Sequence, residues 1–461
     1  MKNVLKKALI ATCIAAASLG SVSNLYASEK HEVLSKARQE ARDWYQDAKF
    51  GVFIHFGAYS LMGGANGDYI AEWVMEKERI AIEDYEKLAG NFNPSQFDAK
   101  EWAQLFEDAG AQYVTITAKH HDGFSMFDSK VTDYDIVDAT PFGRDIMAEL
   151  KKELDKRDIK LFFYYSQVDW HHEDYFPRGR FGQDYTGRDE SNGDWNKYLE
   201  FQNTQLRELL TNYGDVAGIW FDGWWDRKAL PNQGDWDLQG TYEMMRSIQP
   251  GVIISNNHHE VPFPGEDTQL FERDLPGDCN YHFCTKDVRG GVAHEMVDTL
   301  NSEGSWGFHL TKNDVKPTKD LIQTLVKAAG HNANFTLNTG PMPNGKIEPL
   351  HISKYLEIGK WLKVNGETIY GTRGGPLKSR SWGTSTHKDN NIYIHMLDMT
   401  DSALLVNFPA DIEIESATYF GTNKKVPFSV KDGMLKLEFS LEFLQKEMPD
   451  HIIHLKTKKN I

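Results

Sequence analysis

The strongest constraint on the fold of this chain is a series of short apolar runs, each separated from the next by a stretch with helical character. Near-continuous apolar strands that alternate with helices are typical of a parallel sheet covered on both faces. Seven well-defined runs and a weaker one favour a (β/α)8-type barrel over a doubly wound sheet. The well-defined runs are residues 50–57, 113–120, 161–166, 218–222, 252–255, 306–310 and 335–337, and the weak one surrounds Leu270 and Phe271.

Two of the intervening helices are recognisable from their periodicity. The first lies between the first two runs, where apolar residues recur at helical spacing up to the stop signal Gly110. The second precedes the last run and ends at Gly330. Their apolar faces are Trp102, Leu105, Phe106 and Ala109 in the first, and Leu321, Leu325 and Ala328 in the second.

The pattern changes near the turn-rich segment of residues 371–376. Beyond it, Leu435, Leu437 and Phe439 alternate with charged residues, and residues 391–397 also have strand character. Such alternation is typical of antiparallel sheets with one buried face. We therefore predict a barrel domain over residues 28–370 and an antiparallel β-sandwich domain over residues 377–461.

The first 27 residues have the pattern of an export signal. Three lysines stand among the first seven residues, residues 8–22 are apolar and mostly small, and residues 25–27 fit a cleavage site. We expect residues 1–27 to be a cleaved signal peptide and the mature protein to be periplasmic or secreted. Cys279 and Cys284 remain in the mature chain, and a disulfide between them and two buried thiols both stay open.

The charge of the chain limits its partners. The formal net charge is −16, or about −19 without the three lysines of the signal. An acidic surface of this size disfavours phosphate backbones and anionic membranes. No later segment approaches ~18 uninterrupted apolar residues. We therefore expect neither a nucleic acid nor a membrane as a partner.

Polar residues stand at the ends of six of the runs. In barrels of this kind the chemistry collects at the C-terminal ends of the strands. One polar residue there is ordinary solvation, whereas six in order indicate a site. They are His55, the segment Lys119 to Asp122, the segment Tyr164 to Ser166, Asp222, the pair Asn256 and Asn257, and Glu272.

Asp222 is the sharpest of these candidates, because it directly follows the apolar residues 218–221 and would face the barrel mouth between aromatic rings. Its alternative interpretation is a cap for the following helix. The histidine pairs, His120 with His121 and His171 with His172, raise the rival hypothesis of a metallohydrolase. Neighbours on a strand point to opposite faces, so each pair offers one ligand at most. Imidazoles that donate to sugar hydroxyls are the favoured interpretation, and dialysis against chelator would test the rival.

Several segments, in the same order along the chain, resemble those of glycoside hydrolase family 29, the α-L-fucosidases. The resemblance covers about residues 44–370. The matching segments are residues 50–57 (FGVFIHFG), 71–73 (AEW), 109–113 (AGAQY), 118–124 (AKHHDGF), 220–223 (WFDG), 305–308 (SWGF), 337–341 (LNTGP), 344–347 (NGKI) and 359–370.

The resemblance implies a retaining exo-glycosidase that removes terminal α-L-fucose from fucosylated glycans or oligosaccharides, without metal or cofactor. Asp222 stands where the family has its nucleophile. For the acid/base, the alignment of the loop with the family needs one extra residue. Glu272 fits best, Glu295 is the fallback and Glu266 the third choice. Residues implied to bind the sugar are His55, Glu72, Trp73, His120, His121, Trp220 and Tyr164, with Tyr165 as the alternative to Tyr164.

Two further questions concern specificity and activity. An apolar wall would favour the methyl group of fucose, and Trp220, Phe56 and Trp306 are its candidates. The alternatives to an α-L-fucosidase are a glycosidase for a related sugar such as an α-L-galactoside, and a carbohydrate-binding protein on a degenerate hydrolase fold. The presence of a carboxyl facing Asp222 would distinguish an enzyme from a binding protein.

Overall fold

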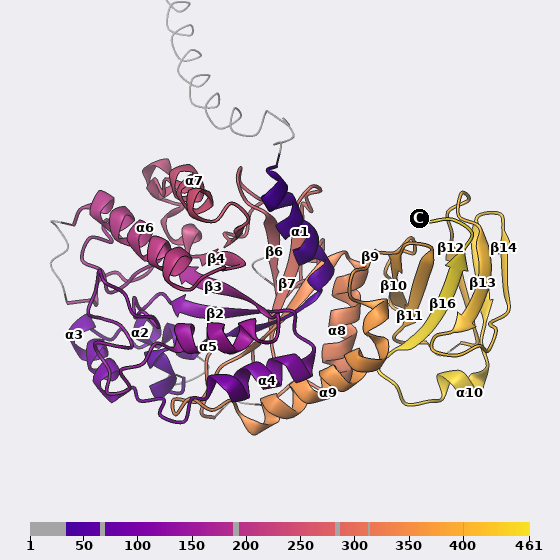
Figure 1. Ribbon diagram of the computed structural model, residues 1–461, viewed down its shortest axis with the longest axis horizontal. Helices are drawn as coiled ribbons and strands as arrows, with labels where there is room; N and C mark the ends of the chain where they lie inside the picture. The colour runs from indigo at the N-terminus through magenta and orange to yellow at the C-terminus, as the bar shows by residue number, and fades with distance from the viewer. Residues whose placement is uncertain (1–33, 65–69, 188–192, 282–285, 312–313, 400) are drawn as a thin grey trace, which may run out of the picture.

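The computed structural model describes residues 34–461 except 65–69, 188–192, 282–285, 312–313 and 400. The predicted signal peptide, residues 1–27, lies outside the described residues. Eight parallel strands form one sheet that curls into a barrel (Figure 1). They are β1 (Phe50–Ile54), β2 (Tyr113–Lys119), β3 (Lys160–Ser166), β4 (Gly218–Asp222), β5 (Ile253–Asn257), β6 (Thr268–Glu272), β7 (Ala293–Thr299) and β8 (Ala333–Thr339).

The barrel is nearly but not fully closed. The hydrogen-bonded order is β5-β4-β3-β2-β1-β8-β7-β6, so β5 and β6 are the two edges and no ladder joins them. One backbone bond crosses this seam, from Asp267 N, just before β6, to the carbonyl of Ile254 in β5 at 2.8 Å. The predicted barrel is therefore confirmed, with one seam that side chains must help to close.

One predicted strand is wrong. Residues 306–310 form a loop, and the seventh strand is β7, which carries His294, Glu295 and Asp298. These polar residues interrupt the apolar run that marks the other strands, because Glu295 faces the barrel interior and is fully buried there. The weak run at Leu270 and Phe271 is a true strand, β6.

Helices cover the outside of the barrel. Six of them follow individual strands, while α1 precedes β1. Short helices occupy the loops. The described parts of the connections from β5 to β6 and from β6 to β7 contain no helix. The helices are α1 (Lys36–Ala48), α2 (Val74–Lys77), α3 (Ile82–Tyr85), α4 (Ala99–Ala109), α5 (Ile146–Asp155), α6 (Trp195–Asn212), α7 (Leu238–Ile248), α8 (Thr318–Gly330), α9 (Pro349–Asn365) and α10 (Leu441–Leu444). The 3-10 helices are η1 (Ala58–Leu61), η2 (Ala71–Trp73), η3 (Glu86–Asn91), η4 (Trp224–Arg227), η5 (Pro231–Gly234) and η6 (Gly366–Thr368).

Both helices predicted from periodicity are present, as α4 and α8. Asp98 caps α4, since its Oδ1 accepts hydrogen bonds from the backbone N–H groups of Lys100 and Glu101. Gly110 ends the helix with a φ of 84°, a left-handed conformation that glycine adopts without a Cβ penalty. None of the described helices combines the length and apolarity needed to cross a membrane.

A buried ionic cluster fastens α1 across the seam between β5 and β6. Asp267 is fully buried, and its Oδ1 accepts from Nε of Arg38 at 2.5 Å and from Nε of Arg42 at 2.6 Å. Its Oδ2 accepts from Arg246 of α7 at 2.8 Å and from the backbone N–H of Ile254 in β5 at 2.9 Å. A single carboxylate therefore binds α1, α7, β5 and the start of β6.

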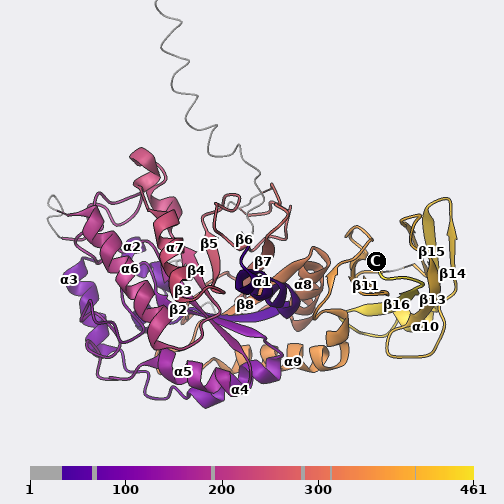
Figure 2. The same ribbon diagram turned by 45° about the horizontal axis from the view of Figure 1, so that its top comes forward.

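The C-terminal domain consists of two antiparallel sheets packed face to face. Its strands are β9 (Arg373–Gly374), β10 (Gly383–Lys388), β11 (Asn391–Met396), β12 (Ala403–Asn407), β13 (Ile414–Tyr419), β14 (Phe428–Lys431), β15 (Met434–Glu438) and β16 (His451–Thr457). The orders are β13-β16-β11-β10-β9 and β12-β15-β14, and side chains from both sheets, including Leu435 and Leu437, share one apolar core. Figure 2 shows this domain on the opposite side of the barrel from α3. The first sheet begins with β9, ahead of the predicted boundary at residue 377.

We expect Asp267→Asn to lower the free energy of unfolding by about 3–5 kcal/mol, because breaking a buried ion pair leaves uncompensated charge. Guanidinium unfolding followed by fluorescence measures this change. The matched control is Glu413→Gln, which removes an exposed ion pair with Lys458 and should leave the unfolding midpoint nearly unchanged. Equal midpoints for Asp267→Asn and the unmodified protein would contradict the role assigned to the cluster.

Candidate active site

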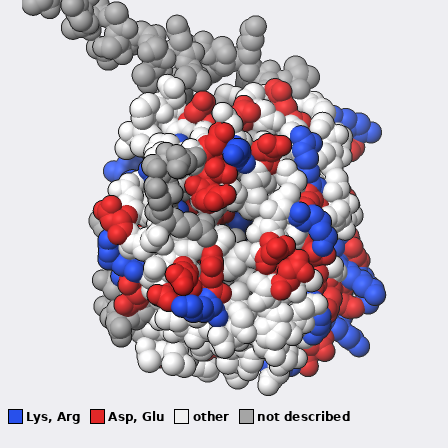
Figure 3. All heavy atoms as spheres, turned by 90° about the vertical axis from the view of Figure 1, so that its left-hand side faces the viewer, with Lys and Arg blue, Asp and Glu red and all other residues white. Residues whose placement is uncertain are grey.

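The candidate site lies at the C-terminal ends of the barrel strands, on the side viewed in Figure 3. On this face, acidic and basic side chains surround a central depression whose walls are mostly uncharged. The loops that follow the strands carry the side chains of the site. Phe53, Tyr164, Trp220, Leu270 and Val297 form an apolar layer inside the barrel, and Trp306 packs against them.

Asp222 ends β4 and is held by four donors. Its Oδ1 accepts from Gly223 N at 2.9 Å, Nε1 of Trp225 at 3.0 Å and Nδ2 of Asn257 at 3.4 Å. Its Oδ2 accepts from the hydroxyl of Tyr164 at 2.9 Å. Burial raises the pKa of Asp222 to about 6, and these hydrogen bonds limit the rise by stabilising the ionised form.

Glu272 ends β6 on the other side of the seam. Its Oε2 accepts from Nδ2 of Asn257 at 2.9 Å and lies 3.9 Å from Nε2 of His259. Burial raises the pKa of Glu272 to about 7; the Asn257 hydrogen bond opposes the rise, and the nearby charge of Asp222 adds to it.

One amide nitrogen therefore contacts both carboxyls. The Asp222 Oδ1 and Glu272 Oε2 atoms are separated by no more than the sum of their 3.4 Å and 2.9 Å distances to Asn257 Nδ2. This limit allows the ~5–5.5 Å carboxyl spacing of retaining glycosidases.

The two alternative glutamates are engaged by neighbouring side chains. Glu295 lies inside the barrel below Trp220 and accepts hydrogen bonds from the Trp220 indole and the Tyr113 hydroxyl, both at 3.1 Å. Glu266 accepts from the Tyr242 hydroxyl at 2.8 Å and contacts His258 Nε2 at 2.9 Å.

Three histidines meet beside Asp222. The ring centroids of His55 and His120 are 5.6 Å apart, and those of His120 and His121 are 4.3 Å apart. His121 Nε2 lies 3.7 Å from Asp222 Oδ2. Tyr164 connects the group, since it stacks on His120 and on Trp220 and donates to Asp222.

The expectation that His120 and His121 face opposite ways is wrong. Strand β2 ends at Lys119, so both histidines lie in the turn beyond it, where the alternation of a strand no longer applies. Alternation does hold within β3. Tyr164 points into the barrel, whereas the Tyr165 hydroxyl donates to Gln205 on α6 at 2.8 Å.

Glu72 and Trp73 come from η2, in the loop after β1. Glu72 is buried, and its Oε2 accepts from the backbone N–H of Gly307 at 2.9 Å. Its Oε1 has no hydrogen-bond partner among the described residues, and burial raises its pKa to about 7. Trp73 packs edge-on against His121 at 5.1 Å. Phe56 is excluded from the site, because it packs between Phe92 and Trp102 outside the barrel.

Sequence reasoning missed Trp225 and His259, and it placed Asn257 at a strand end without assigning a role to it. Trp225 donates to Asp222, lies nearly parallel to Trp73 at 6.0 Å, and so widens the aromatic wall. Asn257 joins the two carboxyls, and His259 lies beside Glu272. Trp225 had a detectable signal, as an aromatic residue three positions after the candidate nucleophile. The bridging role of Asn257 had none, since it depends on the spacing across the seam.

The groups suited to a cation lie elsewhere. Asp128, Asp135 and Asp138 can bring one oxygen each within 4.8 Å of the others. They belong to the connection from β2 to α5, and Asp135 already accepts three backbone N–H groups there. His171 contacts Glu86 at 2.6 Å, and His172 packs against Phe201. Neither joins His120 and His121.

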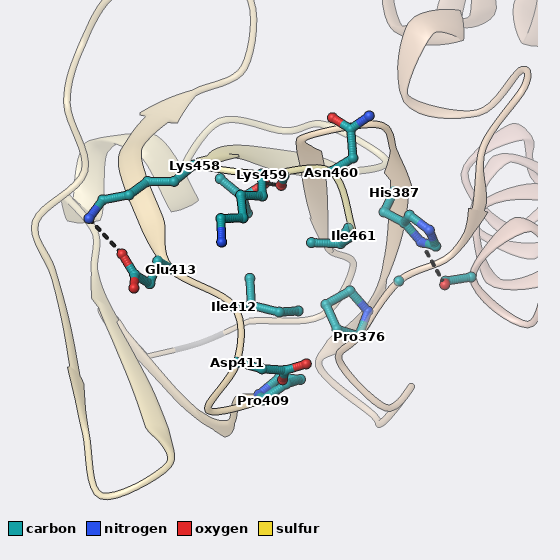
Figure 4. Close-up of a pocket in the computed structure, with 13 residues that line it drawn as sticks. Pro376, His387, Pro409, Asp411, Ile412, Glu413, Lys458, Lys459, Asn460 and Ile461 are labelled. Atoms are coloured by element: carbon teal, nitrogen blue, oxygen red, sulfur yellow. Dashed lines mark hydrogen bonds and ion pairs between the residues drawn. The ribbon is translucent and has the colours of Figure 1, made fainter.

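A separate cavity of about 460 Å³ lies in the C-terminal domain (Figure 4). Glu413, one of the acids that line it, is paired with Lys458 at 2.6 Å, and this bond lowers its pKa. Other residues of the lining are Pro376, His387, Ile412 and Lys459.

Two buried carboxyls that one amide contacts, at the mouth of a parallel barrel, form the arrangement that glycoside hydrolases use. Residues 18–367 match the sequence profile described as Alpha-L-fucosidase, and the chain belongs to that family. The resemblance found in the sequence is thereby confirmed.

Known α-L-fucosidases are similar to this chain in sequence and in structure. The chain is 28% identical over 390 residues to the α-L-fucosidase of Dictyostelium discoideum, with 79% of each chain covered. It is also 28% identical over 390 residues to human tissue α-L-fucosidase, covering 78% of this chain and 77% of the relative. The structure is similar to α-L-fucosidase isoenzyme 1 of Paenibacillus thiaminolyticus, with a TM-score of 0.78, 30% identity, and coverage of 92% and 100%.

A covalent intermediate has been trapped in a further similar structure. It is a GH29 α-L-fucosidase of Bacteroides thetaiotaomicron in complex with 2-fluoro-fucosyl fluoride. Its TM-score is 0.77 at 27% identity, over 91% of this chain and 96% of that one. A covalent intermediate is the mark of a retaining mechanism.

We expect Glu295→Gln to lower the free energy of unfolding by about 1–3 kcal/mol, because an amide cannot accept all the donors that surround this carboxyl. Glu272→Gln should cause no loss, since it removes a carboxyl that burial already makes costly to ionise. Guanidinium unfolding at neutral pH compares the two variants. A larger loss for Glu272→Gln would contradict the division into structural and reactive carboxyls.

Proposed function

We propose that this chain hydrolyses terminal α-L-fucose from glycans or oligosaccharides with retention, using Asp222 as nucleophile and Glu272 as acid/base. The observation that carries the proposal is the contact of Asn257 Nδ2 with both carboxyls. Hydrolysis by this route requires one ionised and one protonated carboxyl on either side of the scissile bond. A second carboxyl so close to Asp222 favours an enzyme over a carbohydrate-binding protein.

In the first step Asp222 attacks the anomeric carbon. Its Oδ2 accepts one hydrogen bond where Oδ1 accepts three, so Oδ2 is the oxygen assigned to the attack. The bond from the anomeric carbon to the leaving oxygen breaks, and that oxygen takes the proton of Glu272. Raised pKa values suit both groups, because Asp222 loses its charge to the new ester and Glu272 stays protonated until the bond breaks.

In the second step Glu272 acts as the base. Its pKa is raised partly by the charge of Asp222, and esterification removes that charge. The pKa of Glu272 therefore falls in the intermediate, so the carboxylate is retained until it accepts a proton from water. The water oxygen bonds to the anomeric carbon, the ester bond breaks, and Asp222 leaves as a carboxylate. Two inversions give net retention.

The sugar is assigned to the space bounded by His55, His120, His121, Glu72 and Trp73. Buried polar atoms that have no hydrogen-bond partner among the described residues support this assignment, among them His120 Nδ1 and Glu72 Oε1. A bound ligand would satisfy such atoms. Trp220 and Trp306 form the apolar layer assigned to the methyl group of fucose. Matched fucosyl and α-L-galactosyl chromogenic substrates test that choice of sugar.

Export belongs to the same proposal. The pattern of residues 1–27 supports it, and so does the disulfide bond of Cys279, since disulfides persist in oxidising compartments. Cys284, whose pairing with Cys279 the sequence left open, lies outside the described residues.

We expect kcat/KM for an aryl α-L-fucoside to follow a narrow bell-shaped pH profile. Activity should fall below about pH 6, where Asp222 becomes protonated, and above about pH 7, where Glu272 loses its proton. Initial rates at low substrate concentration give the two limbs. With a good leaving group, Glu272→Gln should abolish the alkaline limb and keep the acid one. An unchanged alkaline limb in that variant would exclude Glu272 as the acid.

Azide distinguishes the roles of the two carboxyls. Glu272→Ala should slow substrates with poor leaving groups by roughly 10²–10⁴-fold and those with good ones far less. Azide should then restore turnover with a good leaving group and give α-L-fucosyl azide, because it replaces water in the second step. Asp222→Gly should instead give β-L-fucosyl azide, because azide replaces the nucleophile. Nuclear magnetic resonance of the products identifies the anomer.

The matched controls are Glu295→Ala and Glu266→Ala, which should lose stability without azide rescue. Rescue of the Glu295 variant, with formation of the α-azide, would transfer the acid/base role to Glu295.

A further inference from the structure

Two consecutive hydrogen bonds, the second of which ends on a backbone carbonyl, fix the tautomer of His55. Nδ1 of His55 lies 2.7 Å from Oδ1 of Asn338, and Nδ2 of Asn338 donates to the carbonyl of Trp306 at 2.7 Å. A carbonyl oxygen can only accept, so the amide nitrogen of Asn338 must face Trp306 and its oxygen must face His55. Because that oxygen accepts, Nδ1 of His55 carries the proton.

A second pair of hydrogen bonds of the same kind fixes His121. Nδ1 of His121 lies 2.6 Å from Oγ of Ser166, and that hydroxyl donates to the carbonyl of Val168 at 2.7 Å. A serine hydroxyl has one proton, and the carbonyl of Val168 uses it. Nδ1 of His121 must therefore donate to Ser166. Ser166 is fully buried, so in this arrangement no solvent molecule reaches it to take over either bond.

Both rings are neutral at working pH. Burial lowers the pKa of His55 and of His121 to about 3, and for His121 the neighbouring charge of Lys119 contributes. A neutral imidazole with its proton on Nδ1 has a lone pair on Nε2. The 3.7 Å from His121 Nε2 to Asp222 Oδ2 exceeds a hydrogen bond, as expected for two acceptors that face each other.

We propose that Asn338 and Ser166 are positioning residues that fix the tautomers of His55 and His121, so that Nε2 of both rings accepts a hydrogen bond from a sugar hydroxyl. The expectation that these imidazoles donate is thereby reversed. The identity of the ligand as a sugar rests on the proposed function, whereas the tautomers do not depend on it.

The proposal has a direct consequence for recognition. A hydroxyl that meets His55 or His121 must act as a donor there. Fluorine in place of such a hydroxyl accepts weakly and cannot donate, so it should bind no better than hydrogen at that position. A ring that donated from Nε2 would instead discriminate in favour of fluorine over hydrogen.

Neutron diffraction from deuterium-exchanged crystals of the free protein reads the tautomers directly. We expect deuterium on Nδ1 of both rings and none on Nε2. Deuterium on Nε2 of both rings would overturn the proposal. This measurement needs no turnover, so its failure is separate from a failure of the proposed fucosidase activity.

Inhibition constants of monodeoxy and monodeoxyfluoro L-fucose test the same point in solution with the whole enzyme. At one or more hydroxyls, both analogues should bind more weakly than L-fucose by a similar factor of roughly two- to tenfold, the loss of one hydrogen bond. If every fluoro analogue bound as tightly as L-fucose itself, acceptance by the two imidazoles would be excluded.

Ser166→Ala links the effect to the positioning residue. Without its acceptor, His121 is expected to move its proton to Nε2 and donate to Asp222, which shifts the acid limb of the pH profile to lower pH. The fluoro analogue at the affected hydroxyl should then bind better than the deoxy analogue. Ser166→Thr, which keeps the hydroxyl, should restore the original profile and the original ratio. An acid limb at the same pH in correctly folded Ser166→Ala would refute the role of Ser166.

Discussion

Closure of the barrel depends on one buried carboxylate. Strands β5 and β6 lack a ladder, and Asp267 holds them together by binding arginines of α1 and α7 together with the backbone of Ile254. The closure of the seam also positions residues of the candidate site, because β5 ends at Asn257 and β6 ends at Glu272. The spacing that lets one amide contact both carboxyls is therefore set by how the seam is closed below it.

Much of the architecture follows from the sequence, because its main driving force is visible there. Fully apolar strands such as β1 and β4 are buried on both faces and appear as continuous apolar runs. Strand β7 escapes this rule, since Glu295 points into the barrel and is satisfied by donors from β2, β4 and β8. Apolar patterning cannot reveal a strand whose inward side chains are polar and paired.

Some residues of the site could likewise be predicted from the sequence, and others could not. Residues fixed by a strand end, such as Asp222 and Glu272, are predictable from the strand pattern. Those whose role depends on neighbours distant in sequence are not. His120 and His121 face the same side because the strand stops before them, and the role of Asn257 exists only across the seam. The tautomer of His121 cannot be predicted from the sequence either, because it depends on which group accepts the hydrogen bond from the Ser166 hydroxyl.

A column of hydrogen-bonded and stacked side chains runs through the interior of this barrel, alongside its apolar layer. Tyr113 donates to Glu295, Glu295 accepts from the indole of Trp220, Trp220 stacks on Tyr164, and Tyr164 donates to Asp222. A substitution at the bottom of the barrel can therefore change the hydrogen bonding of Asp222, although the substituted residue does not contact a substrate. A screen for altered catalysis therefore has reason to sample Tyr113 and Thr336, at the bottom of the barrel, as well as the residues at its mouth.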